Sequence, residues 1–204
     1  MTQKNQSQQN QNSDRVDTVR HYVSDMLATE KHIREAVENQ VQDESLKQQP
    51  QASQLIQRMH TTLQQHVDQL ERHSEQLGGG SNGLKEAVTS TLGTVAGLYD
   101  KVRTKQVSRM LRDDYTALSM AAISYTMLHT TALALNERST ADLALRNLKD
   151  ITPLITEISQ VIPPVVANEL REDHPGLSVT SGQEATRNTQ EAWDAKVTRQ
   201  RMPV

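Results

Sequence analysis

Two polar side chains fall on helical stripes that are otherwise apolar, and they are the first candidates for chemistry. Glu30 follows Met26 by four residues in one stripe. His66 follows Leu63 by three residues in another. Residues at this spacing share one face of a helix, and in a bundle that face points inward. An unpaired buried carboxylate costs several kcal/mol, so Glu30 needs a partner, a proton or a metal ion.

Three further residues lie on or beside these stripes. His73 lies one heptad after the first imidazole, and Asp114 and Tyr125 interrupt a third stripe. For His73 a solvated imidazole on the bundle rim is the common alternative to a ligand. For Tyr125 a packed ring with a hydrogen-bonded hydroxyl is the common alternative to catalysis. The stripes therefore predict metal binding, if any, at Glu30 and His66, with iron or another divalent ion as the cofactor.

The spacing around the histidines tests for a two-iron centre. Carboxylate-bridged two-iron bundles carry Glu-x-x-His on two helices, which places both ligands one turn apart on one face. The residues three positions before the seven histidines are Thr18, Thr29, Gln57, Leu63, Leu70, Thr126 and Arg171. None is acidic, and one or two carboxylates would leave most of the charge of two iron ions uncompensated. Because no nucleophile–base pair or phosphate-binding glycine loop is visible either, we expect a protein that is not an enzyme.

The elements that would position these residues are four helices. Apolar residues recur at steps of three and four with no period-two alternation, which predicts an all-α four-helix bundle. The predicted helices are residues 14–46, 51–77, 106–136 and 139–170. Ser139 begins a Ser-x-x-Asp capping box, Pro153 should kink the last helix, and Pro163-Pro164 should end or bend it.

The remaining segments are predicted to lie outside the four helices. Residues 1–13 are rich in Gln and Asn and should be disordered. Residues 84–105 should form a short helical crossover between the second and third helices. Residues 171–204 should form a polar tail with a short helix around 184–198. A crossover of this length, between two short connections, is the ferritin-like arrangement.

Composition excludes several classes of function. The chain of 204 residues has a net charge of -3, no basic block and no Cys, so neither nucleic-acid binding nor a disulfide framework is expected. No apolar stretch approaches the roughly 18–20 residues of a transmembrane helix, and the polar start is not a secretory signal. We expect a cytoplasmic location.

Three segments resemble one bacterial family. They are YVSDMLATEKHIREAV at 22–37, QQHVDQLERHSEQLG at 64–78 and LSMAAISYTMLHTTALAL at 118–135. Together they resemble the YciE/YciF-type family of stress-associated ferritin-like proteins, over residues 16–165. The resemblance implies a ferritin-like four-helix bundle with helix pairs joined by a long crossover.

The same resemblance implies that most metal ligands of the family are missing. Glu30 and His66 match two ligand positions, but Thr62 or Leu63 stands where a Glu is expected. Leu118 and Ala121 stand at the two Glu positions of the third helix, and Asp150 is the nearest match to the acidic pair of the fourth. The family's fold is therefore implied, with a degenerate di-metal site.

Three functions follow as alternatives. The first is a non-enzymatic, stress-related protein that acts through self-association, as a homodimer, or through protein partners. The second is residual metal binding or peroxide and iron handling at Glu30 and His66, with Asp114 or Asp150 as partners. The third is a helical adaptor or lipid-associated bundle.

Overall fold

The computed structural model describes residues 2–78, 106–178 and 180–193, and these residues are almost entirely helical. The elements are α1 (Thr2–Val41), the 3-10 helix η1 (Glu44–Gln48), α2 (Pro50–Gln76), α4 (Val107–Ala134), α5 (Arg138–Asp173) and α6 (Ser181–Trp193). The predicted crossover at 84–105 and the end of the predicted tail lie outside the described residues. Within the described ranges there is no strand, so the predicted all-α class is confirmed.

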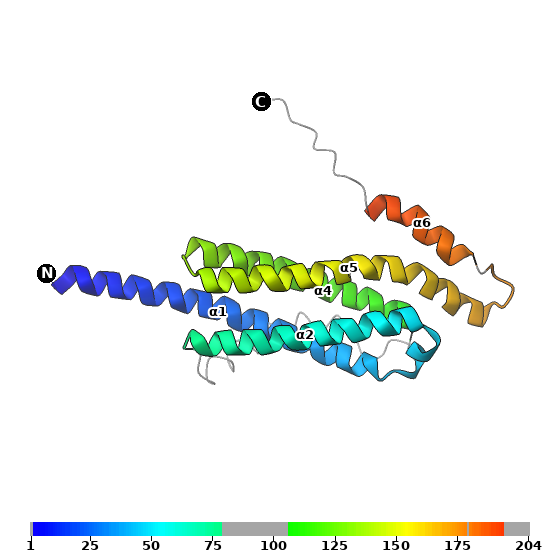
Figure 1. Ribbon diagram of the computed structural model, residues 1–204, viewed down its shortest axis with the longest axis horizontal. Coiled ribbons are helices and arrows are strands. Elements are labelled where there is room, and N and C mark those ends of the chain that lie inside the picture. The colour runs from blue at the N-terminus through cyan, green and yellow to red at the C-terminus, as the bar shows by residue number, and fades with distance from the viewer. Residues whose placement is uncertain (1, 79–105, 179, 194–204) are drawn as a thin grey trace, which may run out of the picture.

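Helices α1, α2, α4 and α5 lie side by side as a bundle (Figure 1). Side-chain contacts fix their relative directions, because residue numbers rise along one helix as they fall along its neighbour. The contacts are Arg20–Leu77 and Arg34–Gln64 for α1/α2, Glu30–Tyr125 and Gln40–Asp114 for α1/α4, Arg58–Glu157 and Gln49–Asn168 for α2/α5, and Ser108–Glu169 and Tyr125–Asn147 for α4/α5. All neighbours are antiparallel, so α2 and α4 run in the same direction and the end of α2 lies at the opposite end of the bundle from the start of α4 (Figure 1).

The first helix is longer at its start than the sequence pattern indicated. Helix α1 begins at Thr2, although residues 1–13 were expected to be disordered. No Pro or Gly interrupts this stretch, and Gln and Lys have good helix propensity, so the helix continues past its apolar stripe. At the other end α1 stops at Val41 instead of 46, because the Asp43 side chain accepts a hydrogen bond from the Ser45 N–H and starts η1.

The prolines of α5 do not end the helix. Pro153, Pro163 and Pro164 all lie inside α5, which continues to Asp173 and bends in its second half (Figure 1). The expectation that Pro163-Pro164 would end or bend the helix is met by the bend. Val161 and Val165 are buried on either side of the proline pair, and this packing offsets the lost backbone hydrogen bonds.

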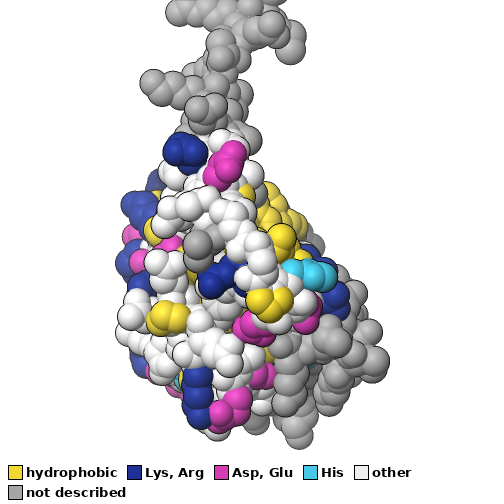
Figure 2. Space-filling model, turned by 90° about the vertical axis from the view of Figure 1, so that its right-hand side faces the viewer, with side chains coloured by type: hydrophobic (Ala, Val, Ile, Leu, Met, Phe, Trp, Pro, Cys, Tyr) yellow, Lys and Arg dark blue, Asp and Glu magenta, His cyan; other side chains and the backbone are white. Residues whose placement is uncertain are grey.

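Helix α6 packs against the proline pair of α5 through a close backbone approach. A Cβ atom at Gly182 would lie 2.8 Å from the Cα of Pro164, so only glycine fits there. The predicted tail therefore contains a helix at Ser181–Trp193, a few residues earlier than the predicted 184–198. Figure 2 shows the adjoining end of the bundle, where apolar side chains form small groups between charged ones.

The core is aliphatic, as the scarcity of aromatic residues requires. Leu, Ile, Val, Met and Ala fill it, and Tyr125 is its largest fully buried side chain. Across the residues that the structure describes, no helix has the length and apolarity needed to cross a membrane.

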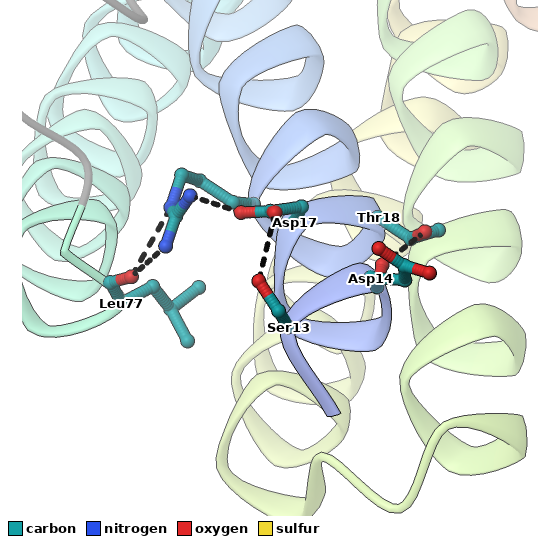
Figure 3. Close-up of polar contacts among 6 residues, drawn as sticks. Ser13, Asp14, Asp17, Thr18 and Leu77 are labelled. Atoms are coloured by element: carbon teal, nitrogen blue, oxygen red, sulfur yellow. Dashed lines mark hydrogen bonds and ion pairs between the residues drawn. The ribbon is translucent and has the colours of Figure 1, made fainter. Parts of the chain in front are cut away.

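The end of α2 is held by a side chain from α1. Arg20 Nε and Nη2 donate to the Leu77 carbonyl oxygen at 3.1 and 2.7 Å, and Arg20 Nη1 also pairs with Asp17. Figure 3 shows the guanidinium between its two partners, with the Leu77 carbonyl on one side and the Asp17 carboxylate on the other. Carbonyls at a helix C-terminus lack helical partners, so a guanidinium satisfies both the hydrogen bond and the helix dipole. Gly78 follows with φ of 77°, the left-handed conformation that ends helices.

Candidate functional site

The two strongest sequence candidates meet at the centre of the bundle. His66 Nδ1 of α2 lies 3.2 Å from Glu30 Oε1 of α1, and the side chains are 1% and 0% exposed. Both side chains face the core, as the apolar stripes predicted, because each follows a buried apolar residue by one helical turn. The structure therefore brings Glu30 and His66 together as a buried pair.

The other ring nitrogen of His66 faces α5. His66 Nε2 lies 3.5 Å from Asp150 Oδ2, but the Asp150 side chain is 57% exposed. This is an ion-pair distance without hydrogen-bond geometry, since Nε2 has no hydrogen-bond partner among the described residues. Asp150 is thus a carboxylate on the rim beside the buried pair.

Tyr125 of α4 completes the contacts around the imidazole. Its ring meets the His66 ring edge-on, with centroids 5.9 Å apart and planes at 86°. Asn147 Nδ2 of α5 donates to the Tyr125 hydroxyl oxygen at 3.0 Å, and Asn147 is itself buried. We call Glu30, His66, Tyr125 and Asn147 the polar layer, because each of the four helices contributes one of them.

Burial controls the ionisation of the tyrosine in the polar layer. It raises the pKa of Tyr125 well above its ordinary value of 10.0, and the charge of Glu30 raises it further. The hydrogen bond from Asn147 opposes the shift. Tyr125 therefore stays protonated and acts as a neutral hydrogen-bonding group near neutral pH.

The donors of the polar layer do not fit a two-iron centre. Such a centre needs several carboxylates around a shared pair of ions. Here the imidazole of His66 lies between Glu30 and Asp150, so no single ion can bind both carboxylates together with one nitrogen of that ring. Each side of the ring offers one carboxylate and one nitrogen, two ligands short of a tetrahedral set. No group of three or more His, Cys, Asp or Glu able to hold a metal ion occurs in the described ranges.

Asp114 is not part of this cluster, which corrects its expected role as a partner of Glu30. It is buried, and its Oδ1 accepts a hydrogen bond of 2.9 Å from Gln40 Nε2. Gln40 lies ten residues beyond Glu30 along α1, about 15 Å at the helical rise. The antiparallel packing of α1 and α4 places Asp114 in that more distant layer.

His73, the weaker of the two imidazole candidates, lies in the last turn of α2. It is 8% exposed, and its Nε2 lies 2.8 Å from the Thr140 hydroxyl of α5. Burial lowers the pKa of His73, and Arg146 lowers it further, while Gln76 and Glu137 act in the opposite direction. The residue is therefore a neutral, hydrogen-bonded link between α2 and α5.

Sequence reasoning missed Asn147. It lies three residues after Ala144 and four before Ile151, both buried, so its spacing carried the signal of a core position. An amide on an apolar stripe deserves the same scrutiny as a carboxylate, because its donors and acceptor also need partners when buried.

A second feature is the outer face of α4. Residues 116–136 contain no Asp, Glu, Lys or Arg. On the exposed side of this helix Ile123 is 59%, Met127 53% and Leu133 38% exposed. We call these three residues, with the exposed Thr126 and Thr130 between them, the α4 face. An uncharged exposed strip with large apolar side chains is typical of a contact surface.

No family model, curated protein or solved structure matches this chain.

Proposed function

We propose that this protein is a ferritin-like helical bundle that acts by self-association as a homodimer, not by catalysis at a metal centre. The observation that carries the proposal is the α4 face. A dimer related by a two-fold axis brings the same surface of each copy together. The uncharged α4 face can meet its own copy without like-charge repulsion and without burying an unpaired charge.

The helix directions support the ferritin-like part of the proposal. Two antiparallel pairs, α1/α2 and α4/α5, with α2 and α4 parallel, need a connection that spans the bundle length, as in ferritin-like folds. The resemblance of the sequence to the YciE/YciF-type family supports the same assignment. A stress-related role is proposed on that resemblance alone.

The polar layer supports a structural role for the former ligand positions. Glu30 is paired with His66, Tyr125 is bonded to Asn147, and the rings of His66 and Tyr125 are in contact, so side chains from all four helices are linked. Hydrogen-bonded groups inside an apolar core favour one register of packing over others. In the proposed function this layer holds α4 in a fixed position against the other three helices, and so fixes the α4 face on the surface of the bundle.

The oligomeric state tests the association. Light scattering coupled to gel filtration should give twice the chain mass of 22.9 kDa. The variant I123E/M127E should run as a monomer, because two copies of a charged patch repel and desolvate poorly. The matched control is V166E/L170E, which adds two charges at the same spacing on exposed apolar residues of α5 and should leave the dimer intact. A native monomer, or a dimer that survives I123E/M127E, would overturn the proposal.

Metal loading tests the alternative of residual metal binding. The purified chain should hold no stoichiometric iron, manganese or zinc after incubation with each ion and desalting, as measured by elemental analysis. The orphaned Glu30 Oε2 and His66 Nε2 atoms are the donors that an ion would use if this expectation fails. Metal retention that Glu30→Ala abolishes would establish the metal function in place of the structural one.

A further inference from the structure

A second candidate site is a groove between α2 and α5, away from the polar layer. It is open to solvent and has a volume of about 330 Å³. The α2 side includes Arg72, His73 and Gln76, and the α5 side includes Ser139, Asp142 and Arg146. On each helix these residues fall within one or two turns of the same side, so a face of each helix lines the groove. This volume is near the lower end of the range for small-molecule sites, roughly 300–1,000 Å³.

The groove carries two arginines that the structure leaves available. In the part of the chain that the structure describes, neither Arg72 nor Arg146 forms an ion pair with a carboxylate. Asp142 is the one acidic residue of the described lining, so the lining has an excess of positive charge. Guanidinium groups bind phosphate and carboxylate groups through paired N–H donors, which makes Arg the usual residue for this recognition.

A contact between α2 and α5 lies beside the groove. His73, one of the lining residues, has its Nε2 2.8 Å from the Thr140 hydroxyl of α5. Arg72 belongs to α2 and Arg146 to α5, the two helices that this contact joins. The spacing of the two helices is therefore set before any ligand arrives, which lowers the entropic cost of binding.

The first turn of α5 reaches the groove, because Ser139 belongs to its lining. Asn136, with φ of 64°, ends the turn after α4, and the chain enters α5 at Arg138 with Glu137 as its N-cap. Ser139, the predicted cap, therefore lies inside the first turn, and the expected capping box is wrong. Ser139 lies in the groove lining instead of capping the helix, and its hydroxyl is a further donor for a ligand.

We propose that the groove binds a small oxyanion, a molecule with a phosphate or carboxylate group held by Arg72 and Arg146. Two features converge there: two arginines without a carboxylate partner among the described residues, and an open groove that both of them line. The site is distinct from the α4 face, so it holds whether or not the protein dimerises.

The test is a titration of the full chain with inorganic phosphate and, separately, with succinate, followed by the backbone amide signals in NMR spectra. We expect saturable shifts that cluster at residues 72–76 and 138–146 for at least one of the two anions. Arg72→Gln and Arg146→Gln should each weaken this binding about tenfold. Lys149→Gln removes the same charge from an exposed position of α5 outside the groove and should change the affinity less than twofold.

Three outcomes would overturn the proposal. They are the absence of saturable shifts with both anions, shifts spread evenly over the surface, and an equal loss of affinity in Lys149→Gln. The titration of the unaltered chain decides the first two without any variant. Circular dichroism of each variant confirms that a loss of binding does not come from unfolding.

Discussion

His66 Nδ1 lies 3.2 Å from Glu30 Oε1 in the centre of the bundle, with both side chains removed from water. This pair links α1 to α2, and the edge-on contact of His66 with Tyr125 extends the link to α4. A buried polar pair is stable only while both members are present, because each satisfies the other.

The Glu30–His66 pair predicts non-additive effects of substitution. Glu30→Leu and His66→Leu should each destabilise the protein by about 2 kcal/mol, because each leaves the other group buried without its partner. The double variant should cost at least about 1 kcal/mol less than the sum of the two. Urea denaturation of the four proteins measures this coupling. Strictly additive losses would show that the two side chains do not depend on each other.

Tyr125 predicts a loss of stability at alkaline pH. Its folded pKa is raised by burial above the unfolded value of 10.0, so the folded state keeps the proton that the unfolded state loses. The contribution is complete below pH 10 and is lost as the pH rises from there towards the folded pKa. Denaturant unfolding between pH 8 and 11 should show this decline.

Tyr125→Phe is the matched variant for that experiment. It should flatten the alkaline decline, because phenylalanine does not ionise. At neutral pH it should cost about 1–2 kcal/mol, since Asn147 Nδ2 loses its acceptor. Tyr115→Phe, on the same helix but only partly buried, is the control and should leave the decline in place. An alkaline profile unchanged by Tyr125→Phe would contradict the assignment.

His73 predicts a loss of stability at acid pH. Burial lowers its folded pKa below the unfolded value of 6.5, so the unfolded state gains a proton first as the pH falls. The contribution of His73 to stability is therefore complete above pH 6.5, and it is lost as the pH falls from there towards the folded pKa. Arg146→Gln should raise the pKa of His73 and shorten this decline, which an NMR titration of the imidazole signals measures directly. A His73 pKa that stays the same in Arg146→Gln would contradict the effect of the Arg146 charge on His73.

The hydrogen bonds from Arg20 to the Leu77 carbonyl at the end of α2 predict a moderate loss of stability on Arg20→Gln. The Leu77 carbonyl would lose both of its guanidinium donors, at a cost of about 1 kcal/mol by denaturant unfolding. Asp17→Asn is the control, because it removes only the exposed partner of Arg20 and should cost less than about 0.5 kcal/mol. Equal losses in the two variants would show that the ion pair, and not the carbonyl contact, matters.

The sequence by itself determined which four segments form the long helices, though not all of their ends, and the two central candidates. Apolar steps of three and four depend on neighbours within one helix, so they placed Glu30 and His66 on inward faces and gave α2 within a residue at each end. The missing acidic residues before every His likewise follow from local spacing. These conclusions hold because a helix places its own side chains without help from other elements.

Only the tertiary structure decided which polar residues share a layer. Asp114 and Tyr125 lie on the same stripe of α4, yet the antiparallel packing on α1 sends Asp114 to Gln40 and Tyr125 to the layer of His66. Asp150 reaches the rim while Asn147, one turn earlier, enters the core. The register between helices is set by side-chain packing over segments far apart in the chain, and no local pattern encodes that distance.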